Sequence, residues 1–255
     1  MLAKFEQLKT ILASCGRTLV AYSGGVDSVF LAKVAHQVLG DRMLAVIADS
    51  PSLPRRELDE ALDLGRQFGF PVRVVRTHEM ADANYTSNPS NRCYFCKSEL
   101  FEELTKIAGF ETIVYGENAS DVGDYRPGAK AAQEYRVRAP LKEAGLTKAE
   151  IRELSALLGL PTAEKPQMAC LSSRIPFGEP VTAEALAMIE AAENVLRDAG
   201  FYEVRVRHHK NMARIEVGPE EIPALVAERE AIAAALQKIG YAYVTLDLRS
   251  EEHTS

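Results

Sequence analysis

The strongest constraint on the fold is the alternation of short apolar runs with longer amphipathic stretches over residues 1–160. Runs rich in β-branched residues, each of strand length, occur at 18–22, 43–48, 72–76 and 112–115. Helical patterns such as 29–39 and 55–68 lie between them. Buried strands separated by helices predict an α/β fold, a parallel sheet with helices on both faces. Such sheets bind ligands beyond the carboxyl ends of their strands.

A second pattern begins at Val181. The expected elements are a helix, two strands, a helix and a strand, at 183–199, 203–208, 213–217, 220–239 and 243–248. This order is typical of a small α+β domain with its own core. We therefore predict two domains, at 1–178 and 181–255.

Composition narrows the class of protein. The chain has 255 residues, of which 47% are hydrophobic and 26% charged, which is ordinary globular usage. No apolar stretch approaches the roughly 18 residues that a membrane span needs, and the first residues do not resemble a signal peptide. The net charge of −6 offers no basic body for nucleic acid. We expect a soluble cytoplasmic protein without a membrane partner, and nucleic acid is not an expected partner.

The turn after the first strand carries the strongest functional motif, Ser23-Gly24-Gly25-Val26-Asp27-Ser28. Adjacent glycines let consecutive backbone amides and a helix N-terminus converge on one anion, and the two serine hydroxyls add donors. Asp27 fits either a helix cap or a carboxylate that holds Mg²⁺. An ordinary glycine-rich turn is the structural alternative. The motif is neither a Walker A loop nor a dinucleotide loop.

This motif resembles the pyrophosphate loop of the PP-loop ATP pyrophosphatases, which have an adenine nucleotide α-hydrolase-like fold. Members cleave ATP between its α- and β-phosphates and activate a substrate oxygen as an adenylate. Asp49, at the end of the second strand, lies near the place where members hold the adenosine. A polar loop at 116–132 contains Asp121, Asp124 and Arg126, which we expect to position Mg²⁺ or substrate.

The four cysteines are too sparse for a disulfide scaffold. Cys93 and Cys96 form a Cys-x-x-Cys pair, which favours metal or redox chemistry. Cys170 lies in a turn-rich segment, where a thiolate stabilised by Arg174 would suit attack on an adenylated carboxylate. Cys15, in an apolar N-terminal helix, is expected to be structural.

Several segments together resemble one family. They are the phosphate loop and residues 91–97, 121–128, 165–178, 204–208 and 243–247. In this order they resemble the LarE family of ATP-dependent sulfur transferases, which build the nickel-pincer cofactor of lactate racemase. The resemblance implies that ATP adenylates a carboxylate of a pyridinium-3,5-dicarboxylate mononucleotide, and that a sulfur nucleophile then displaces AMP.

The cysteines leave the sulfur source open. Some family members sacrifice one cysteine, at the position of Cys170, but this chain also has Cys93 and Cys96. Three thiolates could ligate three irons of a [4Fe-4S] cluster and leave the fourth iron for sulfide from an external donor. The alternatives are a persulfide on Cys170, its sacrifice, or a structural zinc completed by His208 or His209.

Basic residues offer a second anion site. Arg205, Arg207 and His209 alternate along one expected strand and so share a face. With Arg174, the two strand arginines suit a substrate phosphate, although a solvated strand face is the alternative. The resemblance implies a homo-oligomer whose second domain helps to bind this phosphate. Lys97 is expected to face either the ATP phosphates or the thiolates.

Two other functions stay open at this point. A PP-loop tRNA thiolase would use the same adenylation chemistry, but the acidic charge and the lack of an RNA-binding appendage disfavour it. A non-enzymatic ATP-binding metal scaffold is disfavoured by the intact phosphate loop.

Overall fold

The computed structural model describes residues 1–121, 127–166 and 169–249, and residues 122–126, 167–168 and 250–255 lie outside the description. The chain divides into two compact units. Unit 1 comprises Met1–Glu79 and Asn91–Met168, and unit 2 comprises Met80–Ser90 and Ala169–Ser255. None of the described helices is long and apolar enough to cross a bilayer.

Unit 1 is built on a four-stranded sheet in the order β3-β2-β1-β4, and all three pairings are parallel. The strands β1 to β4 span Thr18–Tyr22, Met43–Asp49, Val72–Arg76 and Thr112–Tyr115. Each strand agrees with its predicted range to within one residue. The predicted parallel sheet is therefore confirmed.

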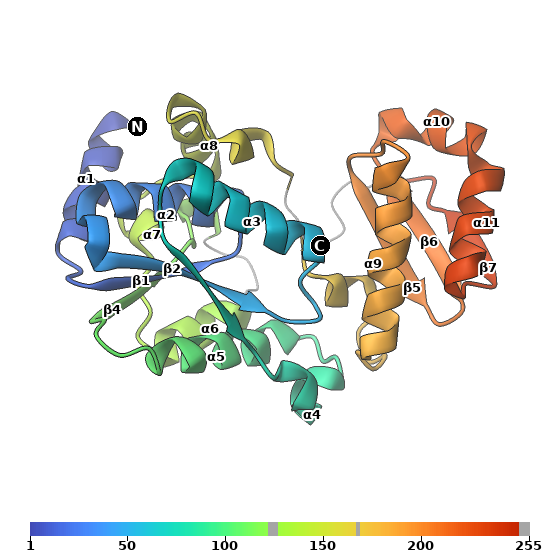
Figure 1. The fold of residues 1–255 in the computed structure, drawn as a ribbon, viewed down its shortest axis with the longest axis horizontal. Coiled ribbons are helices and arrows are strands. Elements are labelled where there is room, and N and C mark those ends of the chain that lie inside the picture. The colour runs from blue at the N-terminus through green and yellow to red at the C-terminus, as the bar shows by residue number, and fades with distance from the viewer. Residues whose placement is uncertain (122–126, 167–168, 250–255) are drawn as a thin grey trace. The chain divides into compact units, whose positions relative to one another are not determined.

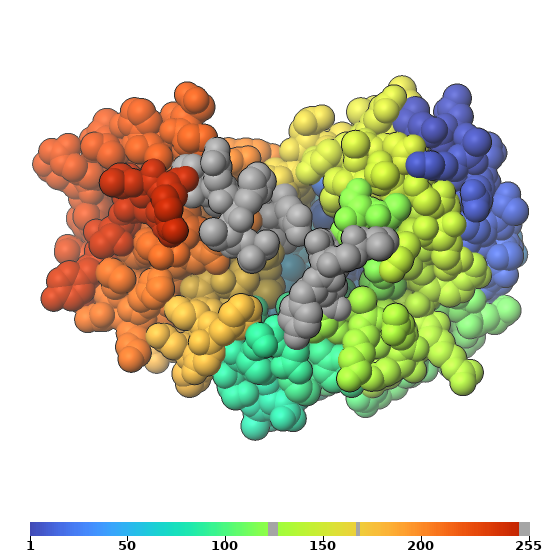
Figure 2. All heavy atoms as spheres, turned by 180° about the vertical axis from the view of Figure 1, so that it is seen from behind, coloured from blue at the N-terminus to red at the C-terminus, as the bar shows by residue number. Residues whose placement is uncertain are grey.

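Helices cover both faces of this sheet, as predicted. Val20 and Ala45 point into one apolar core, whereas Leu19 and Val46 point into another, because side chains alternate along a strand. Figure 1 shows α2 and α3 over one face and α5 and α6 over the other. The helices α1, α2, α3, α5 and α6 span Leu2–Ala13, Val26–Leu39, Arg55–Phe68, Arg92–Thr105 and Pro127–Glu134. Figure 2, which views the protein from behind relative to Figure 1, shows α1, in blue, and α6, in lime, at the surface of unit 1.

One helix of unit 1 replaces part of an expected loop, and another has no counterpart among the predicted elements. The helix α6 takes up part of the polar stretch 116–132, and the Cys-x-x-Cys pair lies within α5. Alanines of α6 pack on α5 and the sheet, while Pro127 occupies the first helical position, which proline favours. This packing stabilises α6 as a helix, which the weak apolar pattern of the sequence did not predict.

Two further helices of unit 1 follow α6 in the sequence. They are α7, Pro140–Glu143, and α8, Lys148–Leu157. The helix α8 begins with a capping box, because the Thr147 hydroxyl accepts from the Glu150 amide while the Glu150 carboxylate accepts from the Thr147 amide. Short 3₁₀ helices η1 to η6 lie at Gly40–Arg42, Glu79–Ala81, Ala119–Asp121, Pro161–Glu164, Leu171–Arg174 and Pro219–Glu221.

Unit 2 is the predicted small α+β fold. Its sheet has the order β5-β6-β7, with β5 and β6 antiparallel and β6 and β7 parallel. The strands span Val204–His209, Met212–Val217 and Tyr243–Leu246, and α9 spans Ala183–Asp198. The expected helix at 220–239 is divided into α10, Ile222–Ala227, and α11, Arg229–Ile239. A short helix α4, Ala83–Thr86, also belongs to this unit.

The bounds of unit 2 differ from the domain prediction. Residues 169–178 and Met80–Ser90 belong to unit 2, whereas both were predicted to lie in the first domain. Two hydrogen bonds join these stretches: the Asn88 side chain donates to the Pro176 carbonyl oxygen over 2.8 Å, and the Gly178 amide donates to the Asn88 carbonyl oxygen over 2.9 Å. These bonds join residues far apart in sequence, so local patterns could not indicate them.

Candidate functional site

The phosphate loop lies between β1 and α2, as the sequence predicted. Gly25 is the N-cap, and the first helical bond runs from the Val29 amide to the Gly25 carbonyl oxygen. The amides of residues 26–28 therefore precede the helical ladder and can donate to a ligand. Ser28 Oγ accepts from the Ser23 amide over 3.1 Å and donates to the Gly25 carbonyl oxygen over 3.1 Å, which holds the turn closed.

The fold constrains the two glycines of the loop to different degrees. Gly24 has a φ of +74°, and a Cβ added there would lie 2.8 Å from Ala61 Cβ on α3. Gly25 has extended backbone angles, and the nearest atom to an added Cβ is Ser23 Oγ at 3.6 Å. The close approach of α3 thus excludes a side chain only at Gly24.

Charged side chains gather around Asp27 at the start of α2. Lys148 forms an ion pair with Asp27, and Asn118 Nδ2 lies 3.5 Å from Asp27 Oδ1. Asp121 is buried and accepts from the Asn118 amide over 3.0 Å. Burial raises the pKa of Asp27, Lys148 lowers it in part, and Asp121 raises it further. An added cation would relieve this concentration of negative charge.

Lys148 is the site residue that sequence reasoning missed. It is the first residue of α8, and its amide donates to Ser120 Oγ over 3.0 Å. The contact of Lys148 with Asp27 depends on α8 lying beside the start of α2. Only the tertiary fold brings Lys148 to Asp27, across 121 residues of chain.

Other residues predicted for nucleotide binding fall in different places. Asp49 ends β2, at the same edge of the sheet as the phosphate loop, and forms an ion pair with Arg55. Lys97 lies on α5 with its Nζ 5.9 Å from the centre of the Phe101 ring. Asp124 and Arg126 lie outside the described residues. The structure therefore places Asp49 at the expected edge but gives Lys97 no contact with the loop among the described residues.

The cysteines belong to both units. Cys93 and Cys96 lie on α5 in unit 1, three residues apart and so on one side of the helix. Cys170 lies in unit 2 and is the N-cap of η5. Within the described ranges, no group of three or more His, Cys, Asp or Glu side chains could hold a metal ion. Two thiolates on one helix cannot supply the three ligands predicted for the cluster, so unit 1 alone does not fit that cluster.

Cys15 is the structural cysteine that the sequence predicted. Its side chain is buried and donates to the Ile11 carbonyl oxygen over 3.2 Å. Burial raises the pKa of the Cys15 thiol, although the nearby Arg138 acts in the opposite direction. A buried neutral thiol of this kind is a poor nucleophile.

Arg174 does not have the geometry expected of a ligand-binding arginine. It is 1% exposed, and its Nε donates to Glu193 Oε1 over 2.7 Å. Its Nη1 donates to the Ala169 carbonyl oxygen over 3.0 Å and to Ser173 Oγ over 2.9 Å. The guanidinium is therefore used inside unit 2, which argues against the predicted roles in binding a substrate phosphate and in stabilising the Cys170 thiolate.

The basic face of β5 has the predicted alternation. Val204 and Val206 are buried in the core of unit 2, whereas Arg205 and Arg207 lie half-buried on the other face. Arg207 Nε donates to both carboxylate oxygens of Glu216 on β6, over 3.0 and 2.9 Å. Glu216 was not predicted, because only the pairing of the two strands places it beside the arginines.

The two histidines on β5 differ from each other. His208 is buried, and its Nδ1 lies 3.0 Å from the hydroxyl of Tyr241. His209 lies on the arginine face, and its Nε2 is buried without a hydrogen-bond partner in the part of the chain that the structure describes. His208 is thus a core residue, and the described residues provide no zinc site around either ring.

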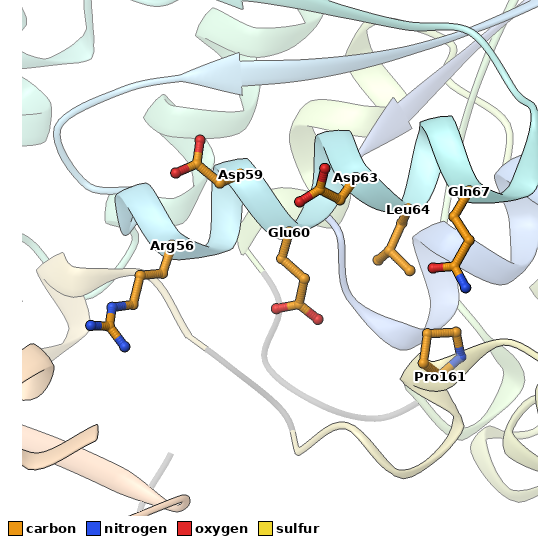
Figure 3. A pocket seen from close by; sticks show the side chains of 7 residues that line it. All are labelled: Arg56, Asp59, Glu60, Asp63, Leu64, Gln67 and Pro161. Atoms are coloured by element: carbon orange, nitrogen blue, oxygen red, sulfur yellow. The ribbon is translucent and has the colours of Figure 1, made fainter. Parts of the chain in front are cut away.

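An open pocket lies along α3. Figure 3 shows Glu60, Leu64 and Gln67 on the side of α3 that faces Pro161. Lys165 pairs with Glu57 and Glu60, over 2.6 and 2.9 Å, and so offsets part of the local acidic charge. An acidic helix face of this kind does not by itself indicate a binding site.

Comparisons with known proteins cover both units. No family model matches the chain. It is 46% identical over 251 residues to an uncharacterised protein of Synechocystis sp., an alignment covering 96% of this chain and 94% of that protein. It is 36% identical over 249 residues to the pyridinium-3,5-bisthiocarboxylic acid mononucleotide synthase of Lactiplantibacillus plantarum, covering 96% of this chain and 90% of that enzyme. It is 28% identical over 215 residues to the glutamine-hydrolysing GMP synthase of Thermomicrobium roseum, covering 71% and 39% of the respective chains.

Proposed function

Since the chain belongs to the family of pyridinium-3,5-bisthiocarboxylic acid mononucleotide synthases, the LarE family, we propose that it inserts sulfur into a pyridinium-3,5-dicarboxylate mononucleotide. The protein is an ATP-dependent enzyme with the PP-loop α/β fold. The observation that carries the proposal is an alignment over 96% of the chain, which includes both the phosphate loop and the Cys170 segment. The product would serve nickel-pincer cofactor synthesis.

The proposed reaction has two chemical steps. A carboxylate oxygen of the substrate attacks the α-phosphorus of ATP, the bond to the β-phosphate oxygen breaks, and pyrophosphate leaves. A sulfur nucleophile then attacks the carboxyl carbon of the acyl adenylate. The bond from that carbon to the adenylate oxygen breaks, and AMP leaves with the oxygen. If the nucleophile is sulfide, a thiocarboxylate remains. If it is the Cys170 thiolate, a thioester remains, and β-elimination then removes the Cα proton to a base and breaks the Cβ–Sγ bond, which releases the thiocarboxylate and leaves dehydroalanine; if it is a Cys170 persulfide, an external thiol cleaves the S–S bond to release the thiocarboxylate.

The phosphate loop would act on the first step. The amides of residues 26–28 and the hydroxyls of Ser23 and Ser28 would donate to the pyrophosphate as it gains charge. Asp27 would hold Mg²⁺, which when bound offsets phosphate charge. Lys148, no longer needed to neutralise Asp27, would then pair with a phosphate oxygen. Asp49 would contact the adenosine at the same edge of the sheet.

Arg205 and Arg207 are proposed to hold the phosphate of the substrate nucleotide. Their place on one half-buried strand face supports this assignment, since arginine pairs with phosphate through two parallel bonds. Glu216 would keep Arg207 oriented.

A homo-oligomer is part of the proposal, and light scattering of the purified protein tests it.

The proposed source of sulfur is a cysteine of this chain, Cys170. Cys170 lies in a segment held at several points, which supports its use as a sacrificed or persulfide-bearing thiol. The three-cysteine cluster with an external sulfide donor stays a prediction, and we derive no step from it. Anaerobic reconstitution with iron and sulfide, followed by absorption spectra of wild type and Cys93→Ala, tests the cluster. Loss of hydrogen sulfide from Cys170 in one turnover, seen by mass spectrometry, tests sacrifice.

Product analysis tests the proposed function. The protein is incubated with ATP, Mg²⁺ and the pyridinium dicarboxylate mononucleotide, and the products are separated. We expect AMP, pyrophosphate and a thiocarboxylate. Release of ADP and orthophosphate would refute the adenylation chemistry, and AMP formation that depends on added tRNA would favour a tRNA thiolase instead.

A further inference from the structure

Several of the hydrogen bonds that hold the chain around Cys170 come from the buried Arg174, and Arg207 Nη1 adds one to the Ser173 carbonyl oxygen over 3.0 Å. We define the Cys170 loop as residues 169–176. Arg174 Nη1 donates to the carbonyl oxygen of Ala169 over 3.0 Å, and it lies 3.5 Å from the carbonyl oxygen of Cys170. The same nitrogen donates to Ser173 Oγ over 2.9 Å. The guanidinium therefore fixes the chain on both sides of the cysteine rather than its sulfur.

Arg174 is held in turn by Glu193 of α9. Both side chains are fully buried, and Glu193 Oε1 accepts from Arg174 Nε over 2.7 Å. The same carboxylate accepts from the Val206 amide of β5 over 3.1 Å and from Arg197 Nη2 over 3.1 Å. A buried ion pair persists only where further hydrogen bonds satisfy its charges, and these bonds connect the Cys170 loop to the core of unit 2.

Two side chains from Met80–Ser90 also hold the loop. The Tyr85 hydroxyl lies 2.6 Å from Ser172 Oγ, and both residues are buried. Asn88, with a φ of +55°, donates to the carbonyl oxygen of Pro176 over 2.8 Å. A buried asparagine in this backbone conformation is costly, so the surrounding bonds must maintain it. The loop is thus held by groups that contact its backbone and hydroxyls.

We propose that Glu193 and Arg174 are positioning residues that hold the Cys170 thiol in place for sulfur transfer. The inference rests on the proposed function, in which Cys170 reacts at the adenylate. Small displacements of a nucleophile lower its rate strongly, since catalysis depends on reacting atoms being held near contact. Adenylation takes place at the phosphate loop of unit 1, so the pair affects the second step and not the first.

Four variants test the role of the pair. Glu193→Gln and Arg174→Gln remove one charge each from the buried pair. Arg197→Gln is the matched control, because Arg197 bonds the same carboxylate from α9 but, among the described residues, does not bond the loop. Tyr85→Phe removes only the hydroxyl that reaches Ser172, without changing any charge.

The first readout is the alkylation rate of each cysteine by iodoacetamide, followed by peptide mass spectrometry. Loss of a charge-assisted hydrogen bond should raise the rate at Cys170 about tenfold in Glu193→Gln and Arg174→Gln. Rates at Cys93 and Cys96, which lie in the other unit, should stay at the wild-type value. Arg197→Gln should match wild type, and Tyr85→Phe should raise the Cys170 rate about threefold.

The second readout is the ratio of pyrophosphate released to thiocarboxylate formed. It should rise about tenfold in Glu193→Gln and Arg174→Gln, with the KM for ATP unchanged, because adenylates form without sulfur transfer. A general loss of stability would lower both products together. An unchanged Cys170 alkylation rate in folded Glu193→Gln and Arg174→Gln would overturn the proposal. If those variants unfold, an unchanged rate in Tyr85→Phe would overturn it.

The alkylation readout needs no turnover. If the wild-type protein forms no pyrophosphate and AMP, the proposed function fails while the alkylation rates still test whether the pair holds Cys170. If products form normally and the Cys170 rate does not change in the variants, the positioning role fails alone.

Discussion

At the scale of single residues, the fold requires glycine at only one of the two glycine positions of the phosphate loop. Gly24 needs a left-handed backbone and has α3 against it, whereas Gly25 has neither constraint. The motif in the sequence indicated both glycines because their pattern is local. It did not indicate Ala61, which lies 2.8 Å from the place of an added Cβ, because that contact crosses the fold.

Gly24→Ala should therefore lower the free energy of unfolding by about 1–3 kcal/mol, from backbone strain and the clash with α3. Gly25→Ala, the matched control, should cost less than about 1 kcal/mol, since alanine only replaces glycine at a helix cap. Urea denaturation of both variants measures the difference. Equal losses would mean that α3 does not constrain Gly24.

Lys148 is the residue whose role depends most on the fold. Lys148→Met should lower kcat/KM for pyrophosphate formation about a hundredfold, because one charged donor to the phosphates is lost. Lys130→Met, which removes an exposed lysine from α6, is the control and should keep the wild-type rate. A wild-type rate in Lys148→Met would exclude Lys148 from the phosphate site.

At the scale of elements, α8 connects the N-terminal helix to the phosphate site. Its capping glutamate, Glu150, also pairs with Lys4 of α1 over 2.8 Å. Bonds from Lys4 and from the Thr147 amide lower the pKa of Glu150 from 4.5 to about 2. The ionised carboxylate thus helps to hold the first turn of α8, which carries Lys148.

The ion pair between Glu150 and Lys4 makes the free energy of unfolding depend on pH. A carboxyl whose pKa is lowered by folding contributes stability that is fully present above its unfolded pKa, here 4.5, and is lost as pH falls toward about 2. Glu150→Gln keeps an oxygen for the cap but loses the charge. The stability difference from wild type should shrink over that window, whereas Glu153→Gln, an exposed change on the same helix, should show no such trend. Thermal melts across the window measure both, and a constant difference for Glu150→Gln would contradict the ion pair.

The elements also show what sequence patterns could predict. The strands and the helices α2, α3 and α9 were predicted because each has a strong apolar period or a cap of its own. In contrast, α5 and α6 were not predicted, since their order comes from packing on the sheet. Arg174 was interpreted as a ligand-binding residue because its partner Glu193 lies on another element and cannot be identified from the local sequence.

At the scale of the whole molecule, the two units divide the proposed chemistry. Unit 1 carries the phosphate loop, Asp27 and Lys148, and unit 2 carries Cys170 and the arginine face. Adenylation and sulfur transfer can therefore be impaired separately by substitutions in different units. The alignment with the synthase of Lactiplantibacillus plantarum extends over both units, in agreement with a reaction that needs both.

The central step of the proposed reaction is the adenylation of a substrate carboxylate before sulfur replaces its oxygen. Substrate labelled with oxygen-18 in its carboxylates tests this step directly, with the phosphates analysed by mass spectrometry after turnover. We expect the label in AMP, because the carboxylate oxygen that attacked the α-phosphorus stays bonded to it when sulfur displaces AMP from the carboxyl carbon. Label in orthophosphate, or AMP without label, would contradict the adenylation step.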